Sequence, residues 1–509
     1  MSRCLDGGAR MAAARIALCL GLAVGGSQPS FAQTSLQPKD WDKSVRLHEA
    51  QDLNPDPHIV EINIETRVAD VELGPGQHVD AWTYNGGVPG PLIRAKPGDR
   101  VIVHFRNRLP QPTTIHWHGI RLNIEMDGVP GISQPPVKTD ETFTYDFVVP
   151  DAGLYWYHPH IRSAEQVGFG VYGPLLVQDP AEDARIGVPD ELVIVISDID
   201  IEDGKLADPE TGATAGMAFG REGNIVLTNG HVGSVGRILA RSGAPQRWRI
   251  LNAAKSRYFA LDLDGQPFVK IGSDGGLAEH STSVTSLVLG PGERADVLVT
   301  PTGAPGSELP VRSLLYNRGY GSVEMRKFDE LLFTIAFTQE PRYTGPPLPQ
   351  VRRAIAALDA SGATRLSMHF TIEQLPNGDF QYGINHKPYW ESTPFVAKLG
   401  ETQLWTLVNE TAWSHPFHLH GFFFQVVDEK GAPIHPIEWK DTVNVPFRAS
   451  PGAPPPTVHV LVRFDERPGT WMIHCHVLDH ADGGLMTGVR VGLPPPTGDV
   501  FAHPHVMRY

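Results

Sequence analysis

The sequence predicts an all-β protein made of three consecutive β-sandwich domains. Three observations support this prediction: a length of 509 residues, an abundance of turn residues with 52 Gly and 45 Pro, and a strand pattern that occurs three times. The length corresponds to about three domains. Frequent Gly and Pro favour many short strands over long helices. We therefore expect helix only in short connecting segments.

The repeated pattern consists of Gly, a polar step, an alternating apolar strand and then Asn. It reads GDRVIVHFRNRL, GAPQRWRILNAAKS and GETQLWTLVNETAW, and its asparagines are Asn107, Asn252 and Asn409, roughly 150 residues apart. Alternation of apolar and polar residues is typical of half-buried strands, and a unit of this length fits a β-sandwich. The first and third units also share the similar segments AGLYWYHPH (152–160) and PGTWMIHCH (468–476). In the middle unit, ERADVLVT at 293–300 corresponds to the strand that comes before these segments.

Polar and Pro-rich joints divide the chain into domains. The segments VQDPAEDARIGVPDE and TQEPRYTGPPLPQ separate the repeated units. The predicted intervals are a signal peptide at 1–32, domain 1 at 45–180, domain 2 at 190–340, domain 3 at 350–495 and a C-terminal tail at 496–509. We expect this tail to be extended and poorly ordered, with no role for its His503 and His505.

The first 32 residues are typical of a leader for export. Arginines precede the apolar run IALCLGLAVGG, and SFA offers small residues for cleavage. The run is too short to span a bilayer, and no later stretch is long enough. The prediction is a periplasmic or secreted protein. Removal of the leader takes away Cys4 and Cys19, so that Cys475 is the only cysteine of the mature chain.

The composition narrows the class of partner. The formal net charge is −14, and such an acidic chain argues against nucleic acid and anionic membranes as partners. A lone thiol in an exported protein is more often a ligand or reactive group than half of a disulfide. We expect a monomer that acts on small molecules.

Histidine is concentrated in four short segments. Ten of the 22 histidines lie in HWH (116–118), HPH (158–160), HPFHLH (415–420) and HCHVLDH (474–480). Two segments fall in the first repeated unit and two in the third. Imidazole and thiolate together suit copper or zinc, whereas the shortage of carboxylate excludes calcium and magnesium. The sequence therefore predicts metal binding shared by domains 1 and 3.

Strand geometry divides these ligands between two sites. Side chains at i and i+2 share a face of a strand, so His474 and His476 face one site and Cys475 faces another. His415 is at odd spacing from His418 and from His420, so it is expected on the side of Cys475, although Pro416 could disturb the strand.

His480 follows the strand and can return to the thiolate. The result is a site of His415, Cys475 and His480, and a second site fed by the other eight histidines. Two Cys-free zinc sites could also use eight histidines, but zinc has no use for a neighbouring His2Cys centre. His2Cys with a weak or absent axial ligand is the blue-copper arrangement, and Cys475 would carry electrons from that copper to its neighbours.

At this point the chain resembles the three-domain multicopper oxidases of the bacterial laccase type, over nearly its whole mature length. Besides the four histidine segments, YNGGVPGPLIRAKPGDRVIVHFRN resembles the opening of the family's first domain. The resemblance implies three cupredoxin-like Greek-key domains, four coppers per chain and O2 as the electron acceptor. It implies type 1 copper on His415, Cys475 and His480, type 2 copper on His116 and His418, and the type 3 pair on His118, His158, His160, His420, His474 and His476.

The axial position of the type 1 site is open between two residues. In the family, the axial residue lies ten positions after the cysteine. This position is Leu485 here, and Met486 follows it directly. A non-coordinating Leu485 would raise the potential of the copper, and a coordinating Met486 would lower it. Leu485 is the favoured assignment.

A carboxylate near the trinuclear cluster is expected to supply protons. Asp127 in IEMDGVP matches the acidic residue that similar bacterial enzymes place after the first histidine segment, although a turn-forming Asp before Gly128 explains the local sequence nearly as well. Many relatives carry a second acidic residue directly after the second type 1 histidine, which is His480 here. In this sequence Ala481 occupies that position and Asp482 comes one residue later, so a second proton-relay residue is in doubt.

The predicted activity is a laccase-like oxidation of phenols or similar aromatic reductants, in four one-electron steps coupled to reduction of O2 to water. Oxidation of Cu(I) is the nearest alternative, but the chain has 9 Met and none in WSHPFHLHGFFFQVVDEKGAPIHPIEWKDTV. Oxidation of Mn(II) is also open. A non-catalytic relative is disfavoured because all ten histidines and the cysteine are present, and a copper nitrite reductase because its shorter subunits lack the paired His-x-His sets. A copper-buffering protein would bind the metal without consuming O2.

Overall fold

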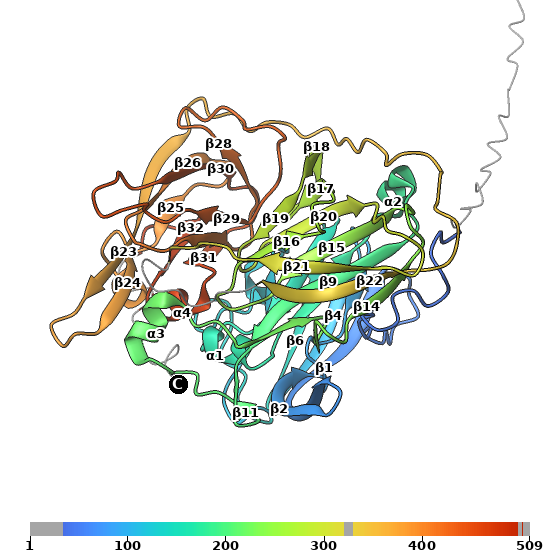
Figure 1. Ribbon diagram of the computed structural model, residues 1–509. Coiled ribbons are helices and arrows are strands. Elements are labelled where there is room, and N and C mark those ends of the chain that lie inside the picture. The colour runs from blue at the N-terminus through green and yellow to red at the C-terminus, as the bar shows by residue number, and fades with distance from the viewer. Residues whose placement is uncertain (1–33, 320–328, 497–500, 502–509) are drawn as a thin grey trace, which may run out of the picture.

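The computed structural model describes residues 34–319, 329–496 and 501, and these residues form three β-sandwiches in sequence (Figure 1). The predicted signal peptide and the tail histidines His503 and His505 lie outside the described residues. Within the predicted tail, Phe501 is described: it is buried, and its ring centroid lies 4.6 Å from that of Tyr389. Burial of this aromatic ring adds apolar contact with the third sandwich.

The first sandwich packs two four-stranded sheets, in the orders β2-β1-β4-β6 and β3-β8-β7-β5. Its strands are β1 (Ile59–Gly74), β2 (Gln77–Tyr84), β3 (Ile93–Ala95), β4 (Arg100–Asn107), β5 (His116–His118), β6 (Thr142–Val148), β7 (Gly153–His158) and β8 (Gly173–Val177). Most pairs are antiparallel, and β1 runs parallel to β4.

The second sandwich has the sheet orders β13-β12-β9-β15-β20-β17-β18 and β14-β22-β21-β16-β19. Its strands are β9 (Glu191–Ile199), β12 (Ile225–Thr228), β13 (His231–Val232), β14 (Arg237–Ala240), β15 (Gln246–Asn252), β16 (Phe259–Asp262), β17 (Phe268–Ser273), β18 (Gly276–Val284), β19 (Ser286–Leu289), β20 (Arg294–Val299), β21 (Glu308–Leu314) and β22 (Glu330–Phe337). A separate hairpin joins β10 (Ile201–Glu202) to β11 (Lys205–Leu206).

The third sandwich has the sheet orders β24-β23-β26-β30-β28 and β25-β32-β31-β27-β29. Its strands are β23 (Thr364–Gln374), β24 (Phe380–Ile384), β25 (Phe395–Ala397), β26 (Thr402–Asn409), β27 (His415–Leu419), β28 (Phe424–Val427), β29 (Thr442–Val445), β30 (Thr457–Arg463), β31 (Gly469–Cys475) and β32 (Met486–Val491). An extended connection, in yellow and orange in Figure 1, leads into it from β22.

The three repeated asparagines occupy the same structural position. Asn107, Asn252 and Asn409 are fully buried at the ends of β4, β15 and β26. The side-chain oxygen of each asparagine accepts a hydrogen bond from the backbone N–H two residues later. The side-chain NH2 group of each donates to one backbone carbonyl in the following turn and to another in a neighbouring segment. Asn satisfies buried backbone groups in this way at a turn. The repeat seen in the sequence is therefore a repeated corner of the fold.

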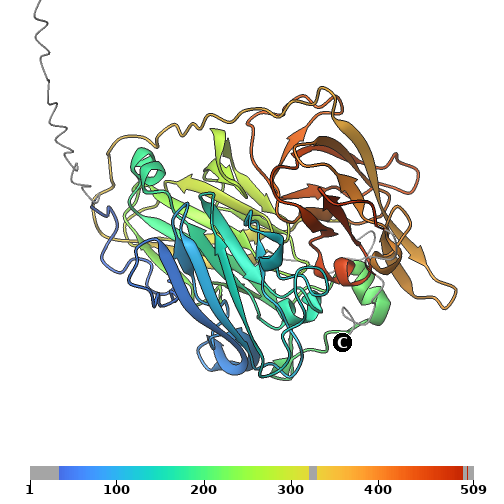
Figure 2. The same cartoon turned by 180° about the vertical axis from the view of Figure 1, so that it is seen from behind.

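Helices are short, as the Gly and Pro content predicts. They are α1 (Ser163–Gly168), α2 (Pro180–Ile186), α3 (Ala213–Phe219), α4 (Leu478–Asp482) and the 3-10 turns η1 (Ile124–Met126) and η2 (Tyr389–Glu391). Among the described residues, no helix has the length and apolar character needed to cross a membrane. Figure 2 shows α3 and α4 together beside the third sandwich, and the two helices are in contact.

The first and third sandwiches share one apolar core. A single cluster of buried side chains includes Trp117 and Tyr157 from the first sandwich and Phe417, Ile473 and Cys475 from the third. The second sandwich has a core of its own around Trp248 and Phe333. The histidine strands β5, β7, β27 and β31 therefore meet where the first and third sandwiches pack together.

Candidate metal centres

Two neighbouring strands of the third sandwich sort the ligands onto two faces. β27 pairs antiparallel with β31, with Phe417 opposite Cys475 and His418 opposite His474. Paired residues share a face and successive residues alternate. Cys475 therefore faces away from His474. The strand continues through Pro416, which pairs with Asn444.

The thiol lies in a compact group with two imidazoles. The Sγ atom of Cys475 is 3.3 Å from Nδ1 of His415 and 3.7 Å from Nδ1 of His480, and the two nitrogens are 3.1 Å apart. His480 comes from α4, which turns the chain back directly after β31. All three side chains are at most 2% exposed. This set is a His2Cys group whose ligand atoms converge on one point.

The other eight histidines converge between the first and third sandwiches. In the first sandwich β5 pairs with β7 so that His116 lies opposite His158. The ring of His116 stacks on that of His420 at 3.8 Å, and the ring of His118 stacks on that of His418 at 3.7 Å. Ligand atoms within 4.8 Å of one another form the groups His116, His418 and His420; His116, His118 and His158; and His160, His420 and His474. His476 lies beside them, 4.9 Å from His118 between ring centroids.

The hydrogen bonds of these rings leave nitrogen atoms free for a metal. Nδ1 of His116 meets the backbone oxygen of Asp127 at 2.8 Å, and Nδ1 of His418 meets that of Asp441 at 2.9 Å. Their Nε2 atoms are buried without a partner among the described residues, as are Nδ1 of His118, Nε2 of His158 and both ring nitrogens of His160 and His476. Buried polar atoms without a partner are costly, and metal-binding histidines use one nitrogen for an orienting hydrogen bond. The residues present therefore fit copper.

The electrostatics of the rings suit metal binding. Burial lowers the pKa of His415 to about 3. It also lowers the pKa of His118, His158, His160, His418, His420, His474, His476 and His480. Neutral imidazole is the form that binds metal. Burial raises the pKa of the Cys475 thiol, so metal binding there releases a proton.

Asp127 is both a turn residue and a member of the site. It follows η1 and precedes Gly128, whose φ of +79° and closeness to the Ile115 carbonyl leave no room for a side chain. Its carboxylate is 1% exposed and lies 2.9 Å from Nδ1 of His420. The same carboxylate is 3.3 Å from Nδ1 of His116. Asp127 therefore connects histidines of the first and third sandwiches.

A second carboxylate, Asp441, was missed by sequence reasoning. It is 1% exposed, and its Oδ1 atom lies 3.1 Å from Nε2 of His118. The buried guanidinium of Arg294 donates to it at 2.7 Å, and Thr442 donates to it at 2.8 Å. Its sequence signal was only a Lys-Asp pair before a short apolar strand. The partner Arg294 lies on β20 of the middle sandwich, so this sandwich also contributes to the site.

Leu485 and Met486 point to different surroundings. Met486 pairs with His474 across β31 and β32, and its side chain packs with Met472 and Ala481. Leu485 is fully buried in the same apolar cluster as Cys475, and its carbonyl accepts a hydrogen bond from the Cys475 backbone N–H at 3.1 Å. Asp482 accepts a hydrogen bond from the backbone of Ala164 on α1.

Comparison with known families agrees with this geometry. Three models of the multicopper oxidase family match residues 65–182, 190–308 and 361–494. The chain belongs to the multicopper oxidase family. It is 32% identical to multicopper oxidase MmcO of Mycobacterium tuberculosis, with 82% of this chain and 84% of that protein covered. It is 25% identical to a laccase of Bacillus subtilis, with 81% and 90% covered.

A solved structure shows the same architecture. A multicopper oxidase of Campylobacter jejuni, described as a metallo-oxidase, superposes with a TM-score of 0.73 at 25% identity and covers 90% of this chain and 99% of its own. The predictions of family, of three cupredoxin-like domains and of copper are confirmed. As a multicopper oxidase, the protein is a copper-dependent oxidoreductase that couples one-electron oxidations of a small-molecule reductant to the reduction of O2 to water.

Proposed function

We propose that this multicopper oxidase is a laccase-like enzyme that takes single electrons from phenols or similar aromatic reductants. The observation that supports this most directly is the alternation along β31, where one thiol and two imidazoles serve two centres one residue apart. In this proposal type 1 copper is held by His415, Cys475 and His480. Type 2 copper is held by His116 and His418, and the type 3 pair by His118, His158, His160, His420, His474 and His476.

The copper ions, when bound, supply the redox chemistry, and the protein's residues supply position and protons. Asp127 holds the ring of His420 and is the residue we assign to proton delivery, because a buried carboxylate at hydrogen-bonding distance can give and regain a proton. Cys475 links the two centres through its backbone to His474 and His476. The assignment of Leu485 as the non-coordinating axial residue is supported by its burial in the apolar cluster that contains Cys475 and by the hydrogen bond from the Cys475 backbone N–H to its carbonyl.

Oxidation of metal ions is the second candidate, favoured by the description of the Campylobacter jejuni enzyme as a metallo-oxidase. Within residues 34–319 and 329–496, however, every group of three or more His, Cys, Asp or Glu side chains able to hold an ion belongs to the two centres already described. A dedicated Mn(II) substrate site needs such a group beside the type 1 ligands. A Cu(I) site also uses Met ligands, and the third-domain stretch WSHPFHLHGFFFQVVDEKGAPIHPIEWKDTV has no Met. The organic donor is therefore preferred.

The test is a comparison of donors. Oxygen uptake by the copper-loaded enzyme is measured with 2,6-dimethoxyphenol, Cu(I) and Mn(II) side by side. Faster turnover of the phenol supports the proposal, and faster turnover of either ion supports the second candidate. Copper binding without oxygen uptake would leave only a copper-buffering role. The optical spectrum of the same sample should show intense thiolate absorption, which Cys475→Ser should remove.

We also propose that the enzyme is exported and monomeric. The apolar run before Ala32 supports a leader, and the isolated Cys475 suits an oxidising compartment. Fractionation of cells and N-terminal sequencing test export, with Gln33 expected at the start of the mature chain. Light scattering during size-exclusion chromatography tests the monomer.

A further inference from the structure

A cavity of about 280 Å³ lies where all three sandwiches meet. The first sandwich contributes Arg121, the second contributes Gly275 between β17 and β18, and the third contributes Arg463 at the end of β30. Among the described residues, its lining includes none of the predicted copper ligands. Ligand pockets in proteins begin at about 300 Å³, so this volume suits a compact molecule with one ring.

Arginine dominates the charged lining of this cavity, which we call the arginine cavity. The charged residues around it are four arginines and two aspartates: Arg121, Arg353, Arg463, Arg467, Asp151 and Asp465. The whole chain, by contrast, has a formal net charge of −14. A concave site lined by one sign of charge attracts molecules of the opposite sign. The arginine cavity is therefore a positively charged site in an acidic protein.

Both carboxylates of the arginine cavity are already paired with two of the arginines. Arg121 donates two hydrogen bonds to Asp151, at 2.6 and 2.7 Å, and Arg467 donates one to Asp465 at 2.6 Å. Burial lowers the pKa of Arg467; Asp465 opposes this effect, and the charge of Arg121 adds to it. The pKa of Arg467 is lowered on balance, so the two carboxylates do not fully offset the positive charge around them.

The other two arginines have no carboxylate as a counter-ion. Arg353 donates only to the backbone carbonyls of Gly275 and Leu277, at 3.3 and 3.4 Å. Arg463 is exposed and takes part in no hydrogen bond or ion pair with the described part of the chain. Their guanidinium groups are therefore available to an anion from solution.

Aromatic rings hold two of the guanidinium groups in place. Arg467 lies over the ring of Phe422, 4.9 Å from its centroid, and Arg121 lies over the ring of Phe423 at 5.6 Å. Arg467 uses two of its five N–H groups, one for a carboxylate and one for the carbonyl of Gly421, and the other three have no acceptor within the described residues. A fixed guanidinium with free N–H groups matches the planar geometry of a carboxylate.

Apolar side chains complete the lining of the arginine cavity. Leu358 and Trp439 line it and are only partly buried, so both leave apolar surface for a ligand. An aromatic ring packs favourably against indole and against the face of a guanidinium. The cavity thus combines donors for a carboxylate with apolar surface for a ring.

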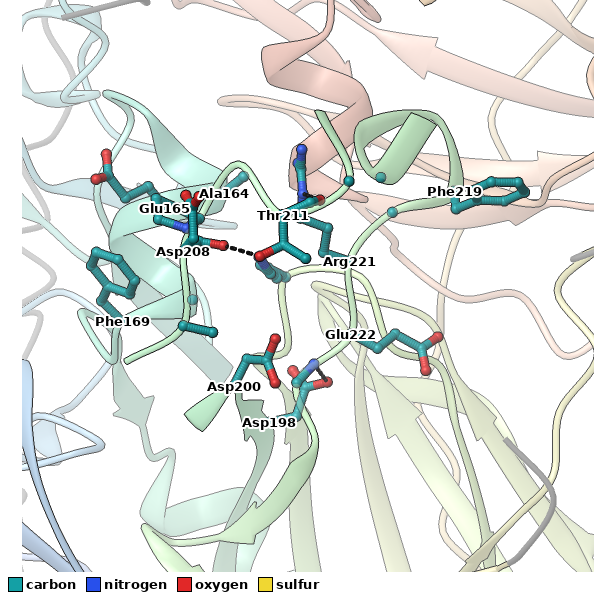
Figure 3. A pocket seen from close by; sticks show the side chains of 18 residues that line it. Ala164, Glu165, Phe169, Asp198, Asp200, Asp208, Thr211, Phe219, Arg221 and Glu222 are labelled. Carbon is teal, nitrogen blue, oxygen red and sulfur yellow. Dashed lines mark hydrogen bonds between the residues drawn. The ribbon is translucent and has the colours of Figure 1, made fainter. Parts of the chain in front are cut away.

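The cavity between α1 and the segment that carries α3 has the opposite charge. Figure 3 shows the carboxylates of Glu165, Asp198, Asp200 and Glu222 there, with Arg221 among them. In all, five carboxylates and two basic side chains line it. An anion is repelled by such a lining, so it should choose the arginine cavity of the two.

We propose that the arginine cavity binds an aromatic carboxylate, with the carboxylate held by Arg353 and Arg463 and the ring packed against Trp439. The ligand is bound and not oxidised, so the site needs no electron path to copper. Because the lining comes from all three sandwiches, a bound ligand joins them. It binds the folded protein and not the unfolded chain, so it also stabilises the fold.

The test is calorimetry of the copper-loaded enzyme with benzoate as the probe. Benzamide is the analogue without charge, and acetate is the analogue without a ring. Arg463→Gln removes one positive charge and Arg463→Glu reverses it, and both variants should fold because Arg463 is exposed. Arg365→Gln is the matched control, since Arg365 is exposed on β23 of the same sheet and does not line the cavity. The blue absorption of each variant reports that its type 1 centre is intact.

We expect Arg463→Gln to bind benzoate about tenfold more weakly, because a charge-assisted hydrogen bond is lost. Arg463→Glu should abolish binding, and Arg365→Gln should bind as the wild type does. Benzamide and acetate should each bind the wild type at least about tenfold more weakly than benzoate, because each lacks one of the two recognised groups. Benzoate should also raise the urea midpoint of the wild type and leave that of Arg463→Glu unchanged.

Two results would overturn the inference. No binding of benzoate to the wild type would show that the arginine cavity is not a ligand site for this class. Wild-type affinity in Arg463→Glu would show that benzoate binds elsewhere on the enzyme. Acetate binding as tightly as benzoate would overturn the aromatic part of the assignment.

Discussion

Replacement of Arg294 by methionine should destabilise the protein and empty the centre formed by the eight histidines. The side chain is 1% exposed. Its five N–H groups meet the carbonyls of Leu154, Gly292 and Asp274 and both oxygens of Asp441. Burial alone would lower the pKa of Arg294, but the negative charges of Asp441 and then Asp274 outweigh the effect of burial. The pKa of Arg294 is therefore raised above its usual value. Methionine has a similar length and offers none of these donors.

The expected loss follows from the partners left behind. Removal of one member of a buried ion pair costs about 3–5 kcal/mol, because the remaining charge stays buried without its partner. Arg294→Lys keeps the charge but has three donors in place of five, so we expect a smaller loss of about 1–3 kcal/mol. Because Asp441 orients His118 and His418, the methionine variant should also lose copper from the eight-histidine centre and keep the thiolate absorption.

The assay is urea unfolding of the copper-free protein, since bound copper would add its own stabilisation. Tryptophan fluorescence reports unfolding, and metal analysis of the loaded protein reports copper. Arg237→Met is the control, because Arg237 is exposed and makes a surface ion pair with Glu308 in the same sandwich, for which we expect at most about 1 kcal/mol. A free energy of unfolding for Arg294→Met within about 1 kcal/mol of wild type, together with a full copper content, would refute the argument.

Asp127→Asn should slow reduction of O2 by about 100-fold or more, as expected for loss of a proton donor, with the blue absorption intact; unchanged oxygen uptake would remove Asp127 from the mechanism. Leu485→Met should lower the type 1 potential in a redox titration, whereas Met486→Leu should not change it; the reverse result would make Met486 the axial residue. Copper-free protein should lose stability as the pH falls. The folded pKa of His415 is about 3 and the unfolded one about 6.5, so between these values only the unfolded chain binds the proton. At about pH 5.5 His415 alone should lower the free energy of unfolding by about 1.4 kcal/mol, and a flat urea midpoint from pH 7 to pH 5.5 would contradict this.

Much of the fold could be predicted because its signals are local. The pattern ending in Asn107, Asn252 and Asn409 marks one corner in each sandwich, and strand alternation separates Cys475 from His474 without any knowledge of tertiary contacts. Metal ligands are also recognisable by type and spacing, since imidazole and thiolate are uncommon in such density.

The parts that sequence reasoning missed depend on contacts between distant segments. Asp441 and Arg294 are 147 positions apart, and neither lies in a pattern that indicates burial. The Tyr382 ring contacts His480, and its hydroxyl donates to the carbonyl of Ala218 on α3. These contacts were missed for the same reason, because Ala218 lies in a Gly- and Ala-rich connection with no distinctive residue. Hydrophobic periodicity reports which face of an element is buried, but it does not report which charged side chain of another domain will meet it.

The sharing of eight histidines between the first and third sandwiches has a consequence for biosynthesis. Synthesis from the N-terminus completes the strands of His116 and His158 long before β27 and β31, so an unfinished chain holds only four of the eight imidazoles. A partial set cannot gather the metal ions that bind and fully reduce oxygen. The complete eight-histidine centre, and with it the four-electron reduction of oxygen, therefore exists only once the last domain has folded.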